Sequence, residues 1–257
     1  MGTFLFNDII FGPVSSRRLG ISLGVNLLPT DYKFCTFNCV YCECGWTLKA
    51  DKKIKLPSPS DVYSELERVL KEYHENKKEI NSITFAGNGE PTIHPDFPEI
   101  IEQTIKLRDQ WMPTAKISVL SNASMLHKTT ITNALQKIDQ NILKLDAGTE
   151  ETYKIINKAQ NHIKFIDIVN YLKAFEGNLI IQTLFLSGEV DQVQFDNTTD
   201  KEVEAWLKLL QEIKPKKVMI YPIERDTPAE YLHRINKDKL EEIAKKVESL
   251  GIQTEVY

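Results

Sequence analysis

The sequence predicts an α/β fold in which a parallel sheet carries helices on its outer face. The main observation is that strand-like apolar segments alternate with segments of helical periodicity along most of the 257 residues. Six of the strand segments are strong, which is too few for a closed eight-stranded barrel. No low-complexity segment or linker interrupts the alternation, so we expect a single domain over residues 1–257 with a short extension at 1–20.

The first two strand segments lie on either side of a polar loop. Residues 4–11 are apolar enough for a short strand, and Gly12-Pro13 interrupts the pattern. Residues 15–20 are polar and typical of a loop. Apolar and polar residues then alternate from Ile21 to Leu27, which is the period of a strand, and Pro29 ends it.

Helices and strands then alternate to the end of the chain. A helix begins after Ser58, which with Pro59 and Asp61 has the sequence of a helix N-terminus. The further strand segments share an apolar run and lie at 82–87, 116–122, 141–147, 179–186 and 216–223. The helices after them share an amphipathic pattern and lie near 96–109, 125–138, 150–157, 162–174 and 200–213. The last helix ends at Gly251, and a short strand over 252–257 would follow it.

Composition and charge exclude several classes of protein. The net charge is −4 and the pI is about 5.8, so the composition offers no global basic face for nucleic acid. The basic run at 49–55 is more typical of a solvated loop. No apolar run approaches the roughly 20 residues that span a bilayer, and the first residues lack the features of a signal peptide. We therefore expect no membrane partner and a cytoplasmic location.

The segment 30–46 holds the strongest chemical signal. Cys35, Cys39 and Cys42 have a C-x3-C-x2-C spacing, which lets a short loop direct all three thiols at one metal centre. Three thiolates are one short of a tetrahedral zinc site and one short of the usual ligands of a 4Fe–4S cluster, so the metal would keep an open position. A redox pair plus a bystander remains an alternative. Cys44 is a fourth ligand, a hydrogen-atom donor or a small buried residue, and the last is most common.

Polar residues also follow the second and third strands. Because ligands bind at the carboxyl ends of parallel strands, these residues are candidates for a binding site. Gly87-Asn88-Gly89-Glu90-Pro91 combines glycines that let the backbone approach a ligand with a carboxylate. The alternative is a plain strand-to-helix turn. Ser121 and Asn122 end the next strand, where they would bind a ligand or, equally, Asn122 would cap a helix.

Charged and polar residues stand on the later strands as well. Lys144 and Asp146 are two residues apart, so they share one face of a strand as an ion pair or as a ligand-binding pair. Gln182 is a polar side chain within an apolar strand and needs hydrogen-bonding partners. Tyr221 and Arg225 follow the sixth strand, where a substrate would enter, although a surface turn is as common there.

The pair Arg17-Arg18 has the chemistry of a phosphate site but precedes the strand that starts at Ile21. Eight strand residues span roughly 26 Å, so the pair is expected at the far end from the cysteines. A structural ion pair is therefore the default interpretation.

The segment Cys35-Thr-Phe-Asn-Cys-Val-Tyr-Cys42 resembles the cluster loop of the radical S-adenosylmethionine (radical SAM) enzymes. The resemblance implies an open six-stranded (β/α)6 partial TIM barrel, a 4Fe–4S cluster on Cys35, Cys39 and Cys42, and SAM on the fourth iron. It also places Tyr41 beside the adenine. The segment Gly87–Pro91 resembles the family motif Gly-Gly-Glu-Pro that binds the SAM amino group, with Asn88 splitting the paired glycines.

The same resemblance assigns roles to the other strand-end residues. It implies that Lys144 lies near a carboxylate, Asp146 near ribose or substrate, and Gln182 near the adenosine. The residues expected to bind SAM are therefore Tyr41, Gly87, Asn88, Gly89, Glu90, Ser121, Asn122, Lys144, Asp146 and Gln182. Tyr221 and Arg225 are possible substrate contacts, and no further catalytic residue is assigned.

The function implied is reductive cleavage of SAM to a 5′-deoxyadenosyl radical that abstracts hydrogen from an unidentified substrate. Gly12-Pro-Val-Ser-Ser-Arg-Arg-Leu-Gly20 and the sequence after Asn38 resemble the branch grouped with wyosine-type tRNA-modifying enzymes, which favours an RNA base. A peptide- or protein-modifying activase is the alternative within this class. Flavodoxin or ferredoxin would be the electron donor. Outside the class, the alternatives are an iron–sulfur electron carrier or redox sensor, and a zinc module that uses Cys44.

Overall fold

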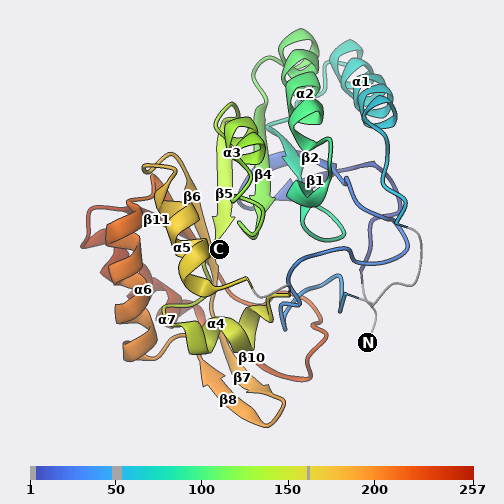
Figure 1. Cartoon of the computed structure of the whole chain (residues 1–257). Coiled ribbons are helices and arrows are strands. Elements are labelled where there is room, and N and C mark those ends of the chain that lie inside the picture. The colour runs from blue at the N-terminus through green and yellow to red at the C-terminus, as the bar shows by residue number, and fades with distance from the viewer. Residues whose placement is uncertain (1–3, 48–53, 161–162) are drawn as a thin grey trace.

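The computed structural model describes residues 4–47, 54–160 and 163–257. Among these residues, eight strands form one sheet. Figure 1 shows that the sheet is curled and that helices lie along its outer side. In spatial order the strands are β1 (Ile10–Ser16), β2 (Gly20–Val25), β3 (Ser82–Phe85), β4 (Lys116–Ser121), β5 (Gln140–Lys144), β6 (Ile180–Leu184), β9 (Lys217–Tyr221) and β11 (Gln253–Val256). Strand β1 is antiparallel to β2, and all other neighbours in the sheet are parallel.

The helices have the amphipathic faces that the sequence predicts. They are α1 (Pro59–Glu75), α2 (Phe97–Trp111), α3 (Thr129–Leu135), α4 (Glu150–Asn157), α5 (Phe165–Lys173), α6 (Asp200–Ile213) and α7 (Lys237–Glu248). The capping box at the start of α1 is present, because the Ser58 side chain and Asp61 exchange hydrogen bonds. Val62, Leu66 and Leu70 follow at intervals of four and are buried, so one stripe of α1 faces the core. None of the helices in the described ranges is long and apolar enough to cross a membrane.

The strand count differs from the predicted six. The six predicted segments form the neighbouring strands β2, β3, β4, β5, β6 and β9, and the short segment after Gly251 adds β11 as a seventh parallel strand. The eighth strand, β1, lies at 10–16 instead of 4–11. It crosses Gly12-Pro13 with a register shift between Phe11 and Val14. A proline is tolerated there because β1 is an edge strand whose ladder need not be continuous.

Two further differences concern short elements. Helix α3 is shorter than predicted, since 125–128 form turns before it. The strand predicted at 179–186 divides into β6 and β7 (Leu186–Val190), which pairs with β8 (Val193–Asp196) and β10 (Tyr231–Arg234) in a small antiparallel sheet. These strands are short and partly exposed, so the sequence shows no strong apolar run for them. Most of the basic run 49–55 lies outside the described residues.

A buried asparagine joins the two sheets. The Asn197 side chain donates to the carbonyl oxygens of Asp146 (2.8 Å) and Leu184 (2.9 Å) and accepts from the Leu186 N–H (2.8 Å). It therefore holds the loop after β5 against the junction of β6 and β7. All of its amide atoms are paired, as burial requires.

Replacing Asn197 with alanine should lower the free energy of unfolding by about 2–4 kcal/mol, because the partner carbonyls would stay buried without donors. Urea denaturation would measure the change. The matched variant is Asn76→Ala, which removes one exposed hydrogen bond to the Glu72 carbonyl and should cost less than about 1 kcal/mol. Equal losses in the two variants would contradict this role of Asn197.

Candidate functional site

The cysteine loop lies over the carboxyl ends of the strands because two neighbouring segments hold its backbone. The Phe34 N–H donates to the Asn88 carbonyl (2.8 Å), and the Glu90 N–H donates to the Phe34 carbonyl (3.2 Å). Farther along, the Val40 N–H donates to the carbonyl of Ile156 in α4 (2.9 Å). The loop is therefore fixed on one side by the turn after β3 and on the other by α4.

The three cysteines of the motif line one cavity of about 240 Å³. Cys35 Sγ accepts from the Phe37 N–H (3.4 Å) and from Asn122 Nδ2 (3.5 Å), and Cys39 Sγ accepts from Asn157 Nδ2 (3.6 Å). Burial raises the pKa of Cys35 to about 12 and also raises the pKa of Cys39. Within the described ranges, no group of three His, Cys, Asp or Glu residues is arranged to hold a single metal ion, and this includes the three cysteines. The donor set is three soft thiols of one loop facing one shared space, which fits an iron–sulfur cluster with one ligand missing.

Cys44 differs from the other three cysteines in its contacts. Its Sγ donates to the Gly87 carbonyl (3.5 Å). The interaction between the Cys42 and Cys44 thiols lowers the pKa of Cys42 and raises the pKa of Cys44. Cys44 also lines the cavity and is therefore part of the site. Its thiol differs from the other three in donating to a backbone carbonyl.

A buried lysine beside the cysteines was not identified from the sequence. Lys33 is only 2% exposed, and its Nζ donates to the Gly45 carbonyl (3.0 Å). Burial lowers its pKa, but the sulfurs of Cys42, Cys35 and Cys39 outweigh burial, so the pKa of Lys33 is raised. Its ammonium therefore stays charged and offsets negative charge on the thiolates. The available signal was a lysine two residues before the first cysteine, within a largely apolar segment.

The glycines after β3 bring the backbone close to the loop. Gly87 and Gly89 have φ values of +146° and +144°, which side chains rarely adopt. A Cβ on Gly89 would lie 1.9 Å from the Phe34 carbonyl oxygen, so this approach requires glycine. Both glycines line the cavity.

Asn88, between these glycines, points elsewhere. Its Nδ2 donates to the carbonyls of Phe6 and Pro29 (2.8 Å each), and its Oδ1 accepts from the Phe6 N–H (2.9 Å). These contacts use all of its amide groups, and Asn88 is not among the residues that line the cavity. Its backbone is engaged as well, since its N–H donates to Asn26 Oδ1 (3.1 Å) and its carbonyl accepts from the Phe34 N–H, so the structure gives no support to its predicted role in binding a cofactor. The side chain holds the N-terminal segment against the turn.

Glu90 is a buried carboxylate that connects two strand ends. Its Oε1 accepts from the Thr92 N–H (3.1 Å) and the Ser121 hydroxyl (2.8 Å), and its Oε2 accepts from the Asn122 N–H (2.6 Å). Burial raises its pKa and these hydrogen bonds oppose the rise. Glu90 lines the cavity, but its oxygens are already engaged by its own chain. It therefore positions Ser121 and Asn122 beside the cysteine loop.

Asn122 extends this connection to the cysteine loop. Its Nδ2 donates to Thr36 Oγ1 (3.0 Å) as well as to Cys35, and its Oδ1 accepts from the Ser124 N–H (3.0 Å). The helix after it begins only at Thr129, so Asn122 stabilises a turn instead of capping a helix. The structure therefore does not support the helix-capping interpretation of Asn122.

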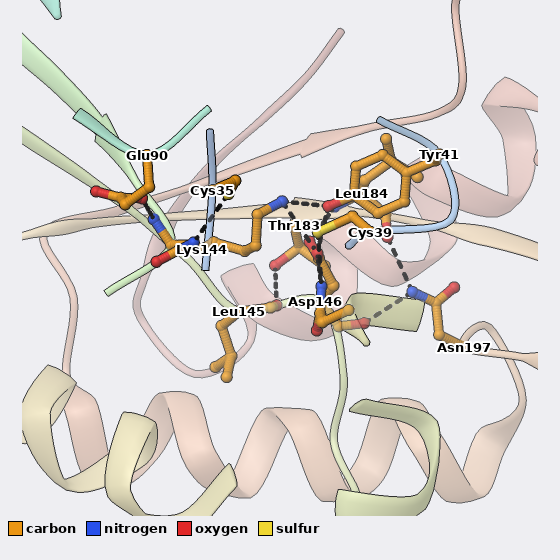
Figure 2. A network of polar contacts seen from close by, with 12 residues as sticks. Cys35, Cys39, Tyr41, Glu90, Lys144, Leu145, Asp146, Thr183, Leu184 and Asn197 are labelled. Atoms are coloured by element: carbon orange, nitrogen blue, oxygen red, sulfur yellow. Dashed lines mark hydrogen bonds and ion pairs between the residues drawn. The ribbon is translucent and has the colours of Figure 1, made fainter. Parts of the chain in front are cut away.

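Tyr41, Lys144 and Asp146 form one network, shown in Figure 2. The Tyr41 hydroxyl donates to Asp146 Oδ2, and Lys144 Nζ donates to the Tyr41 oxygen and lies 3.2 Å from the same carboxylate oxygen. Asp146 also accepts from the Leu184 N–H (3.0 Å) and from Asn157 Nδ2 (2.9 Å). Lys144 and Asp146 are thus an ion pair. Lys144 also lines the cavity, whereas the Asp146 side chain is fully buried and engaged.

A second cavity of about 410 Å³ adjoins the first. Tyr41, Cys42, Leu120 and Gln182 line both cavities. Tyr221 and Arg225 line the second one, with Gln182 as a hydrogen-bonding neighbour of the Tyr221 hydroxyl. Except for Asn88 and Asp146, the predicted cofactor and substrate residues therefore line two adjoining cavities.

Arg17 and Arg18 line the second cavity together with Cys42, so their side chains face the same space as the cysteine loop, which the sequence-based expectation did not include. The turn after β1 lies near the amino end of β2, but long arginine side chains reach into the space that the curled sheet encloses. The structural ion pair is confirmed for Arg17, which lies 3.4 Å from Glu224.

Comparison with known proteins identifies related sequences. Residues 30–200 match the model of the radical SAM superfamily. The chain is 32% identical over 246 residues to a protein of Brachyspira hyodysenteriae named GTPase Obg, covering 93% of this chain and 33% of that protein. It is 30% identical over 242 residues to a UPF0026 protein of Methanocaldococcus jannaschii, covering 92% of this chain and 69% of that protein. The chain thus spans only about a third of the first relative.

Solved structures share the fold at low sequence identity. A radical SAM methyltransferase from Sphaerobacter thermophilus superposes with a TM-score of 0.68 at 13% identity, covering 92% of this chain and 65% of that one. Streptococcus suis SuiB bound to S-adenosylmethionine gives 0.62 at 14% identity, covering 91% and 50%. Archaeal TYW1 gives 0.56 at 16% identity, covering 89% and 71%. The family match over residues 30–200 shows that the chain belongs to the radical SAM superfamily, and these solved structures share its fold.

Proposed function

We propose that this protein is a radical SAM enzyme that binds one 4Fe–4S cluster through Cys35, Cys39 and Cys42 and binds SAM at the remaining iron. The observation that carries the proposal is that these three thiols line one cavity together with the backbone of Gly87 and Gly89. When bound, the cluster supplies the electron that cleaves SAM to methionine and a 5′-deoxyadenosyl radical, which abstracts hydrogen from a substrate. The low-potential electron donor would be flavodoxin or ferredoxin, and we propose that residues 1–257 act as one domain.

The protein would contribute charge balance and orientation at the cluster. Lys33 offsets the negative charge of the thiolates, and the amides of Asn122 and Asn157 donate to Cys35 and Cys39. Hydrogen bonds to the sulfur ligands stabilise the reduced form of such clusters. Cys39 and Lys33 are buried, which keeps water away from the reacting atoms.

The SAM side of the cavity would be formed by the strand ends. The backbone carbonyl of Gly89 suits the SAM ammonium, and Glu90 adds a negative charge close to it. Lys144 suits the carboxylate. The Tyr41 hydroxyl is engaged by Lys144 and Asp146, which leaves the ring to contact the adenine.

The substrate we propose is an RNA base, following the resemblance of the cysteine loop and the segment 12–20 to wyosine-type enzymes. The likeness to archaeal TYW1 is compatible with this but shows the fold alone. SuiB, which has been solved with its precursor peptide SuiA, keeps a peptide substrate as the second candidate. An electron carrier would need neither the glycine turn nor Lys144 in the cavity.

The decisive experiment is anaerobic reconstitution of the full chain followed by reduction with dithionite in the presence of SAM. The wild-type protein should form 5′-deoxyadenosine, measured by liquid chromatography. Replacing Cys35, Cys39 or Cys42 with alanine should remove the cluster and abolish this product, because each thiolate is a ligand. Normal product formation by any of the three variants would show that its cysteine is not a ligand.

Cys44→Ala is the matched variant for that series. Because Cys44 Sγ donates to the Gly87 carbonyl, it should not be a cluster ligand. The variant should keep its iron and sulfide content, its visible absorption and its SAM cleavage. Loss of the metal centre would mean four thiolates and a closed cluster, and would sink the proposal that SAM binds iron.

Glu90→Gln should weaken SAM binding about ten- to a hundredfold, because it would disturb the charge-assisted hydrogen bonds, each worth roughly 1.5–3 kcal/mol, through which Glu90 positions Ser121 and Asn122. An amide in place of the carboxylate would set an NH2 group against the Asn122 N–H or the Ser121 hydroxyl. Calorimetry with SAM measures the change, and iron content should not alter. The control is Glu99→Gln, on the exposed face of α2. Equal SAM affinity in both variants would remove Glu90 from the site.

A further inference from the structure

The second cavity, of about 410 Å³, opens beside the proposed SAM site. It shares Tyr41, Cys42 and Gln182 with the cysteine-lined cavity, so a molecule within it would contact whatever the cysteines hold. The predicted SAM residues line mainly the first cavity. The second cavity is therefore the natural place for the molecule that SAM chemistry would act on.

More arginines than acidic residues line the second cavity. Its lining includes three arginines and two glutamates. Glu224 pairs with Arg17 (3.4 Å) and with Arg234 outside the lining (2.6 Å), and Glu43 pairs with Arg225 (2.7 Å). Both acids are thus neutralised by other arginines. Among the described residues, none forms an ion pair with Arg18.

Arg18 is half-buried and has no ion-pair partner among the described residues. Its guanidinium carbon lies 4.9 Å from the centroid of the Tyr221 ring, and its charge acts on the hydroxyls of both Tyr221 and Tyr257. Stacking on the ring holds the guanidinium plane but uses none of its N–H donors. No side-chain hydrogen bond of Arg18 occurs within the part of the chain that the structure describes. Five donors in a fixed fork remain for a ligand.

We propose that Arg18 binds an oxyanion, a carboxylate or a phosphate, of the substrate of this enzyme; the inference rests on the proposed function. A guanidinium pairs with such groups through two parallel hydrogen bonds, and the pairing is stronger in an enclosed site than in water. Tyr221 fixes the guanidinium and Gln182 bridges toward the first cavity. Because Arg18 also borders a cavity at the amino ends of β3 and β4, it stands at the floor of the enclosed space. The substrate would thus place its anionic end on Arg18 and its reacting end toward Cys42.

Calorimetry on the anaerobically reconstituted full chain at low ionic strength tests this inference. The probes are inorganic phosphate, acetate and, as the neutral counterpart, acetamide. We expect phosphate or acetate to bind and acetamide not to bind. Arg18→Gln should raise the Kd of the bound anion about ten- to a hundredfold. Arg18→Lys keeps the charge without the fork and should give a smaller loss. Preference for phosphate would indicate a nucleotide-like substrate, and preference for acetate a carboxylate substrate.

Arg68→Gln is the control, because Arg68 lies on the exposed face of α1 and, among the described residues, pairs with Glu65 and Glu72. It should bind anions like the wild type. An unchanged Kd in Arg18→Gln, an equal loss in Arg68→Gln, or binding of acetamide as tight as that of the anions would overturn the inference. The assay does not require SAM cleavage. Absent deoxyadenosine with intact Arg18-dependent binding would therefore refute the proposed function alone, and the reverse result would refute this inference alone.

Discussion

The site depends on the placement of buried cations beside groups that must carry negative charge. Lys33 lies beside three cysteine sulfurs, and Lys144 lies 3.2 Å from Asp146 while still facing the cavity. The pKa of each lysine is raised by these partners in spite of burial. Neither lysine would be stable inside the protein without such a partner. The thiolates, in turn, need the cation, so the loop and its counter-charge stabilise each other.

Hydrogen bonds between neighbouring loops fix the positions of the residues around the cavity. Glu90 joins the ends of β3 and β4, and Asn122 continues to Cys35. Asn88 uses all of its amide groups to hold the segment around Phe6, which leaves the adjacent glycine backbone beside the cavity. Each of these side chains already forms its hydrogen bonds with other residues of the protein. The cavity therefore needs little rearrangement before a ligand binds, which lowers the entropy cost of binding.

The sequence predicts the parts of the fold and site that follow from periodicity and spacing. The six strand segments, the helix at Ser58 and the shared cavity of Cys35, Cys39 and Cys42 are found as expected. It could not predict that β1 crosses Gly12-Pro13, because edge pairing depends on β2. It also missed Lys33, and it named Arg18 only as a structural residue far from the cysteines. The surroundings of both side chains depend on burial and on which partners lie near them in space. A single sequence shows the charge of a lysine or arginine but not its counter-charge.

Whether one iron of the bound cluster is left for SAM is the central question, and Mössbauer spectroscopy of the 57Fe-reconstituted full chain answers it directly. With three cysteine ligands, one iron of the four should change its isomer shift when SAM is added, because its coordination number rises. The other three irons should keep theirs. Four irons whose spectra stay the same at saturating SAM would contradict the account, since every iron would then already have a protein ligand.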